Sequence, residues 1–303
     1  MNAFQRFWDS DIAWSWRHSP VAIFGTVMTI VLFIGALGAP WLAPHNPFDL
    51  ASVDLMDALL PPAWQSEGQL NYLLGTDSQG RDLFSALLYG TRISLLIGFA
   101  SVILAMVVGI GLGLIAGYNG GRIDAFIMRV ADVQLSFPAI LIALLIDGVA
   151  RAAVPQHLLD VIAFPVLVGA IALAGWPQYA RTVRGSTLVE KNKEYVQAAK
   201  VIGVSGPRIM FHHVLPNVLG PVLVLATVHL ATAIITEATL SFLGVGVPPT
   251  SPSLGTLIRV GNDFLFSGEW WITIFPGLML VLLVLSVNLL GDWLRDALNP
   301  KLN

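Results

Sequence analysis

The stretch SLLIGFASVILAMVVGIGLGLIAG, from Ser94 to Gly117, decides the class of fold. It contains no charged residue, and it is long enough to cross the hydrocarbon core of a bilayer, which is about 30 Å thick and requires ~20 apolar helical residues. Only helices and closed barrels satisfy all their backbone polar groups in lipid. The run lacks the alternation of apolar and polar residues that marks barrel strands. It therefore predicts a membrane-spanning helix.

The rest of the chain shares this apolar character. Of its 303 residues, 55% are hydrophobic and 12% are charged, whereas about a quarter of the residues in a soluble globular protein are charged. Five more runs meet the same test: Val21–Leu42, Ala125–Val149 (with Pro138 inside it), Val161–Tyr179, Leu219–Leu243 and Trp270–Gly291. The first of these is longer than the apolar part of a cleaved signal peptide, about 7–15 residues, so we expect it to be retained. The predicted fold is an all-α, polytopic membrane bundle of about six transmembrane helices.

Lysine and arginine residues are distributed unevenly about these spans. With the N-terminus inside, the cytoplasmic side carries twelve of the 16 and the outer side carries four. This bias predicts a multi-pass membrane protein with both termini in the cytoplasm. The inner set is Arg6, Arg17, Arg122, Arg129, Arg181, Arg184, Lys191, Lys193, Lys200, Arg208, Arg295 and Lys301, and the outer set is Arg81, Arg92, Arg151 and Arg259.

The segments outside the spans suggest two parts. Residues 1–92 contain an N-terminal interfacial segment, the first span and a long outer, periplasmic loop over 43–91, and residues 93–303 contain the other five spans and an inner loop over 180–218. Aromatic residues near the start fit either a helix lying in the membrane interface or an ordinary aromatic belt. They are Phe4, Phe7, Trp8, Trp14 and Trp16.

Several classes of function are not expected. The net charge of −3 gives no general attraction to nucleic acid, and the absence of cysteine excludes disulfides and thiolate metal sites. No Gly-Lys pair occurs, so the chain has no phosphate-binding loop of its own. His212 and His213 are adjacent and point to different sides of a helix, so we expect no metal site. No hydrolytic motif is present, and we expect a non-catalytic subunit.

The inner loop predicts two short helices joined by a hinge. The first covers roughly Ser186–Ile202, and Gly203 follows it, where a left-handed residue ends a helix. Ser205 is placed to cap the second helix, and Pro207 stands in its first turn, where a missing N–H costs little. The pair Leu215–Pro216 is expected to close it.

One face of the first loop helix is small and apolar. Tyr195, Ala198, Ala199 and Ile202 recur at helical spacing. Two neighbouring alanines leave a shallow surface against which another protein can pack. The alternative is a solvated loop that merely joins two spans, and the spacing alone does not decide between them.

The segment QAAKVIGVSGPRIMFHHVLP, from Gln197 to Pro216, resembles the EAA motif of ABC-importer permeases. Ala198, Ala199, Gly203, Leu215 and Pro216 are in register with that motif, while Gln197 replaces its glutamate and His213 stands where isoleucine is common. The resemblance implies that this loop couples the chain to a separate ATP-hydrolysing subunit. Gln197 keeps the size and hydrogen bonding of glutamate but lacks its charge.

Three more segments are similar to the C-type permease subunit of dipeptide, oligopeptide and nickel importers. They are LGTDSQGRDLFSALLYGTRISL (Leu74–Leu95), TEATLSFLGVGVPPTSPSLGTLI (Thr236–Ile258) and NLLGDWLRDALNPKL (Asn288–Leu302), with departures at Ala86 and Leu254, where Arg and Trp are expected. The resemblance implies the type I ABC importer permease fold and a location in the cell inner membrane. It also implies as partners a homologous B-type permease, two ATP-binding subunits that use ATP and Mg, and a substrate-binding protein. No cofactor is expected on this chain.

Polar residues in and near the spans are further candidates for a functional or structural role. Glu237 lies in the outer part of the fifth span, where a carboxylate either lines the translocation pathway or is hydrogen-bonded to Thr236 or Thr239. Arg129 and Asp132 are spaced to pair on one helix face.

Two glycine-containing segments add further expectations. Gly109, Gly113 and Gly117 recur every four residues and predict close approach of another helix. In the outer loop, Asp77, Gly80, Arg81 and Asp82 are candidates for a contact with the binding protein or for an outer gate. The alternative for this segment is a capped surface helix, with Asp77 as one candidate for the cap.

Together these features predict a permease subunit that moves dipeptides or oligopeptides by alternating access and is energised by separate ATPases. An ion-coupled secondary transporter is the alternative from another class; it predicts inverted repeats, and we find none. Within the same importer family, nickel or another small solute is an alternative substrate.

Overall fold

The computed structural model describes residues 11–49 and 53–297. Apart from one isolated β-bridge, between Thr76 and Asp82, the regular structure in these ranges is helical. The long helices are α3 (Pro20–Leu37), α5 (Leu83–Asn119), α6 (Gly121–Leu135), α7 (Ala139–Ala153), α8 (Leu159–Glu190), α11 (Leu215–Phe242) and α13 (Trp271–Ala297). The short ones are α2 (Asp11–Arg17), α4 (Ala39–Leu42), η1 (Leu55–Asp57), η2 (Gln156–Leu158), α9 (Glu194–Val201), α10 (Gly206–Arg208), η3 (Ile209–Val214) and α12 (Leu254–Asn262).

In the described part of the chain, five helical segments are long and apolar enough to cross a membrane: α3, α5, α8, α13 and the run Gly206–Phe242 that ends with α11. The third predicted span, Ala125–Val149, is instead broken into α6 and α7, whose axes differ by 92°. A straight helix there is wrong because Pro138 has no N–H and disfavours helical backbone before it. It stands just before α7 with φ −56° and ψ 131°. The two helices provide a sixth span only as a bent pair.

Helix α5 begins earlier than the predicted Ser94. The Asp82 side chain accepts a hydrogen bond from the Ser85 N–H and caps the helix, so the first turn starts at Leu83. A boundary between residues 92 and 93 therefore falls inside one continuous helix. At the other end, Gly120 has φ +69° and stops α5.

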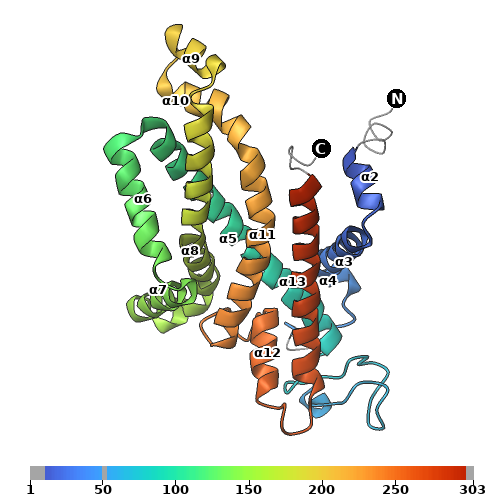
Figure 1. Cartoon of the computed structure of the whole chain (residues 1–303). Coiled ribbons are helices and arrows are strands. Elements are labelled where there is room, and N and C mark those ends of the chain that lie inside the picture. Colours follow the sequence, from blue (N-terminus) through green and yellow to red (C-terminus); the bar gives the residue numbers. More distant parts are fainter. Residues whose placement is uncertain (1–10, 50–52, 298–303) are drawn as a thin grey trace.

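Figure 1 shows how the helices are arranged between two ends of the molecule. The short helices α2, α9 and α10 and the last turns of α13 lie at one end, and α12, the start of α5 and the loop before it lie at the other. Both ends of the described chain therefore lie on one side, as expected for an even number of crossings. Phe4, Arg6, Phe7, Trp8 and Lys301, which enter the predictions above, lie outside the described residues.

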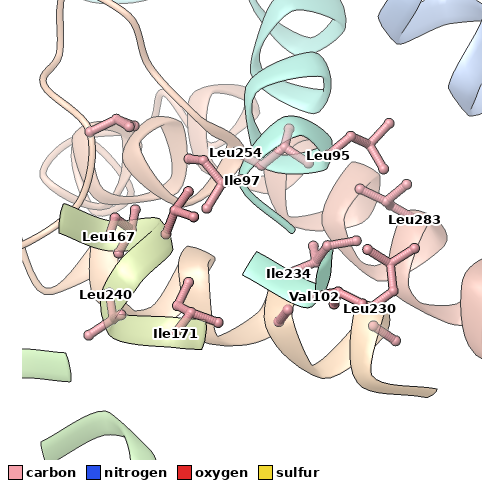
Figure 2. Packing of buried hydrophobic residues seen from close by; sticks show 14 of the residues in the cluster. Leu95, Ile97, Val102, Leu167, Ile171, Leu230, Ile234, Leu240, Leu254 and Leu283 are labelled. Carbon is pink, nitrogen blue, oxygen red and sulfur yellow. The ribbon is translucent and has the colours of Figure 1, made fainter. Parts of the chain in front are cut away.

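Side chains from seven helices of the described chain, α3, α5, α7, α8, α11, α12 and α13, meet in the largest apolar core. Figure 2 shows leucine, isoleucine and valine residues of α5, α8, α11, α12 and α13 pointing toward one another. Other apolar residues on the same helices stay exposed, among them Val107 on α5 and Val281 on α13. This distribution is expected in lipid, where apolar side chains gain little by leaving the solvent and helices associate through close packing.

The closest packing joins α5 to α8 and confirms the predicted glycine stripe. A Cβ added to Gly109 would lie 2.3 Å from Tyr179 Cβ. At Gly113 it would lie 2.6 Å from the Ala180 carbonyl oxygen, and at Gly117 it would lie 2.7 Å from Thr187 Cβ. Glycine at these positions lets the two backbones approach to a distance that no other residue permits.

We expect Gly113→Ala to destabilise the protein by about 1–3 kcal/mol, because the added methyl group must push α8 away. Gly111→Ala is the matched control, since a Cβ at Gly111 meets no atom within 4 Å. Thermal unfolding of both variants in detergent measures the difference. Equal midpoints for Gly113→Ala and Gly111→Ala would show that this contact is not tight in the protein.

Candidate functional site

The inner loop forms a helical elbow, residues 191–214, between α8 and α11. The predicted single helix Ser186–Ile202 is wrong, because α8 continues to Glu190 and the elbow's own helix α9 begins only at Glu194. The chain breaks between them because Lys193 has extended backbone, with ψ 151°. Gly203 follows α9 with φ +79°, which confirms the predicted left-handed hinge.

The second half of the elbow runs directly into the membrane. Ser205 precedes α10 and Pro207 lies in its first turn, as predicted, although the Ser205 side chain makes no capping hydrogen bond. The helix does not close at Leu215–Pro216: the wider π-helix η3 follows α10 and continues into α11. Pro216 lies in the first turn of α11, where its missing N–H is tolerated.

Helix α9 has an inner and an outer face. Val196 and Ala199 are buried and pack in one cluster with residues of η3 and the spanning helices. Ala198 is exposed, and Val201 and Ile202 at the tip are 87% and 78% exposed. The predicted face of Tyr195, Ala198, Ala199 and Ile202 lines one open groove on the surface of the elbow, although Ala199 itself is only 6% exposed. A spacing of three residues places Ala199 beside Val196, at the buried edge of this face, and its role in docking stays a prediction.

Three polar contacts tie the elbow to the spanning helices. Lys191 Nζ donates to the Gly117 carbonyl at 2.6 Å, at the carboxyl end of α5, where a cation is favoured. The Tyr195 hydroxyl donates to Glu190 Oε1 at 2.6 Å and accepts from Asn217 Nδ2 at 3.0 Å, which links α8, α9 and α11. Helix α9 is therefore bonded to α8 and α11, and Lys191, just before α9, is bonded to α5.

The Tyr195 hydroxyl remains a donor under physiological conditions. Partial burial and the hydrogen bond to the Glu190 carboxylate raise the pKa of Tyr195 to about 12. Because this pKa lies far above neutral pH, the O–H that reaches Glu190 is retained.

The structure places Glu237 in the protein interior. Its side chain is 0% exposed and accepts hydrogen bonds from Ser94 Oγ at 2.8 Å and from Ser241 Oγ at 2.7 Å. The predicted partners Thr236 and Thr239 instead donate to carbonyl groups of their own helix. Glu237 thus links α11 to α5, and its role in a pathway stays a prediction.

Ionic contacts between α6 and α8 replace the predicted pair within α6. Asp132 does not pair with Arg129 but is hydrogen-bonded to Arg181 of α8. One turn further along α8, Arg184 holds Asp124 in a two-pronged contact of 2.5 and 2.7 Å. Sequence analysis missed these pairs because their members are 49 and 60 residues apart. The available signal was two acidic residues on α6 and two arginines on α8, at the same side of the membrane.

The predicted contact or gate residues of the outer loop, Asp77, Gly80, Arg81 and Asp82, are buried by other parts of the chain. Asp77 and Arg81 are 1% and 5% exposed and form an ion pair of 2.7 Å. Arg81 Nη1 also donates to the Pro249 carbonyl at 3.2 Å, which joins this loop to the α11–α12 connection. A Cβ on Gly80 would lie 2.1 Å from the Asp54 carbonyl oxygen. These residues, with the buried helix cap Asp82, hold the outer end together and offer no surface to a binding protein here. Asp82, and not Asp77, caps the helix.

We expect Arg81→Gln to destabilise the protein by about 3 kcal/mol or more, because it leaves the Asp77 carboxylate buried without its cation. Arg181→Gln is the control: Arg181 also pairs with an aspartate, Asp132, but the two side chains are 50% and 53% exposed, and such pairs contribute at most about 1 kcal/mol. Thermal unfolding compares the two. Equal shifts of the two unfolding midpoints would contradict a stabilising role for the buried Asp77–Arg81 pair.

Comparisons with known proteins agree with this architecture. Residues 109–303 match the family model described as binding-protein-dependent transport system inner membrane component. Residues 6–62 match the N-terminal TM domain of oligopeptide transport permease C. Two solved structures of the MetNI methionine ABC transporter in inward facing conformations are similar in fold, each with a TM-score of 0.54 over 71% of this chain and 96% of theirs, at 20% and 22% identity.

Named relatives align along nearly the whole chain. The di/tripeptide transport system permease protein DppC of Pseudomonas aeruginosa is 40% identical, with 98% of this chain and 92% of the relative covered. The dipeptide transport system permease proteins DppC of Haemophilus influenzae and Escherichia coli K12 are 39% and 41% identical, with 98% and 100% of this chain and 95% and 94% of theirs covered. The chain therefore belongs to the family of binding-protein-dependent transport system inner membrane components, among the C-type permeases of the dipeptide and oligopeptide importers.

Proposed function

We propose that this chain is one of two permease subunits of an ATP-driven importer that carries dipeptides across the inner membrane. The names of its relatives from Haemophilus influenzae and Escherichia coli give dipeptide as their substrate, which supports dipeptide over nickel. The partners are a homologous B-type permease, two ATP-binding subunits that use ATP and Mg, and a substrate-binding protein. The chain itself performs no chemistry.

The observation that carries this proposal is the elbow with its exposed tip. Val201 and Ile202 are apolar and extend away from the core, as expected of a surface that another protein covers. Contacts of Lys191 and Tyr195 join the same elbow to α5, α8 and α11. A motor subunit that holds the tip is thereby connected to three spanning helices.

The orientation of the chain in the membrane follows from the docking of the ATPases on the elbow. The elbow end is cytoplasmic, so both termini are cytoplasmic, in agreement with the excess of lysine and arginine on that side. Closure of the two ATPases moves the elbows together, the bundle opens outward to accept a peptide from the binding protein, and ATP hydrolysis returns it to the inward state.

Reconstitution tests the proposed function. The chain is placed in liposomes with its B-type partner and both ATPases, and uptake of a radiolabelled dipeptide is measured with binding protein outside and ATP inside. We expect uptake that needs ATP and binding protein and persists when ionophores remove all ion gradients. Uptake that needs a gradient but no ATP favours a secondary transporter and overturns the proposal.

For the coupling role we expect a double variant, Val201→Glu with Ile202→Glu, to abolish co-purification of the ATPase subunits. Two buried charges at an interface core are strongly unfavourable. The chain itself should keep its thermal stability, because both side chains are exposed. Phe266→Glu is the control: it changes a 95% exposed apolar residue between α12 and α13, at the other end of the molecule. ATPases retained by the double variant would exclude the tip as the docking surface.

A further inference from the structure

A groove of about 190 Å³ opens between α8 and α11, two helices that lie side by side in Figure 1. Its position is central, because Gly175 is near the midpoint of α8 and His229 is near the midpoint of α11. Four polar side chains line it: Gln178, His229, Thr232 and Thr236. Polar side chains at this depth are unfavourable against lipid and mark a solute path or a protein contact.

The histidine in this groove is accommodated by a glycine. A Cβ on Gly175 would lie 2.3 Å from His229 Cε1 and 2.7 Å from its Nε2. The imidazole ring therefore rests directly against the backbone of α8. Any side chain at position 175 would displace the ring from its place in the lining of the groove.

The hydrogen bond of His229 fixes which ring nitrogen carries the proton. The Tyr179 hydroxyl lies 3.0 Å from His229 Nδ1. Among the described residues this hydroxyl has no other partner. Since a buried O–H without an acceptor is costly, the hydroxyl donates to Nδ1. The neutral ring then carries its proton on Nε2, which has no partner within the described chain and is a donor toward the groove.

The other three polar side chains of the groove differ in whether they can donate or accept a hydrogen bond. The Gln178 amide makes no hydrogen bond within the described part of the chain, so both its donor and its acceptor are free. The hydroxyls of Thr232 and Thr236 already donate to carbonyl groups of α11, at 2.9 and 2.8 Å. They can therefore only accept. The groove thus presents two donors, from His229 and Gln178, beside several acceptors.

We propose that this groove binds the main chain of a dipeptide during its passage through the membrane. His229 Nε2–H donates to a peptide carbonyl or carboxylate oxygen, and the Gln178 amide and threonine hydroxyls face the peptide N–H groups. This inference rests on the proposed function. Because ligand pockets usually enclose about 300–1,000 Å³, the groove is one wall of the site, and the homologous permease supplies the other.

Substitutions of the polar residues that line the groove, made in the reconstituted importer, test this proposal. We expect His229→Phe, which keeps a ring in the same space, to lower dipeptide uptake about tenfold through loss of the donor. His229→Gln keeps a donor and should recover part of the rate. Thr232→Val should lower uptake more than Thr239→Val, because Thr239 is bonded to its own helix in the same way but lies outside the groove.

A second measurement does not depend on these variants. The chain has no cysteine, so Gln178→Cys introduces its only thiol, at an exposed position. We expect a water-soluble methanethiosulfonate to label this thiol in the assembled importer, and we expect alanyl-alanine with binding protein and ATP to slow the labelling.

The outcomes separate the two proposals. If the unmodified importer takes up dipeptide but His229→Phe transports at the same rate, or Gln178→Cys is inaccessible or unprotected, the groove is only a contact with the other permease and this inference is overturned. If the unmodified importer shows no ATP-driven dipeptide uptake, the proposed function itself fails. Reduced uptake in His229→Phe, together with protection of the Gln178→Cys thiol from labelling, supports dipeptide binding in the groove.

Discussion

The close approach of α5 and α8 is the constraint on which the rest of the structure depends. In lipid, helices gain little from burying apolar side chains, so their association requires backbones that fit closely. Gly109, Gly113 and Gly117 provide this fit along one side of α5. Helix α8 then carries two features of function, since its central part forms the groove and its end leads into the elbow. A shift of α8 would displace both together.

Polar contacts fix the two ends of the bundle in different ways. At the elbow end they are partly exposed and connect short elements to long ones, as Lys191 and Tyr195 do. At the outer end the Asp77–Arg81 pair is buried and joins two loops. Between them, Glu237 links α5 and α11 through buried hydroxyl groups. Only the links at Glu237 lie within spanning helices, where lipid provides no hydrogen-bonding partners.

The elbow shows how far local sequence can predict a site. Gly203, Ser205 and Pro207 were placed correctly because their effects arise within a few residues of the backbone. The shared face of Tyr195, Ala198, Ala199 and Ile202 was also predicted, but not that Ala199 would be only 6% exposed. How much of this face is covered depends on what packs beneath α9, and those residues come from η3 and the bundle.

The sequence by itself determined that the chain is a helical membrane protein, where most of its spans lie, and where a glycine stripe would pack. These are properties of continuous segments, set by hydropathy and by local backbone sterics. Only the tertiary structure decided that Pro138 separates two helices bent by 92°, that Asp132 contacts α8, and that His229 lies against Gly175. Each of these depends on how distant helices meet in space, and a pattern of neighbouring residues contains no information on that geometry.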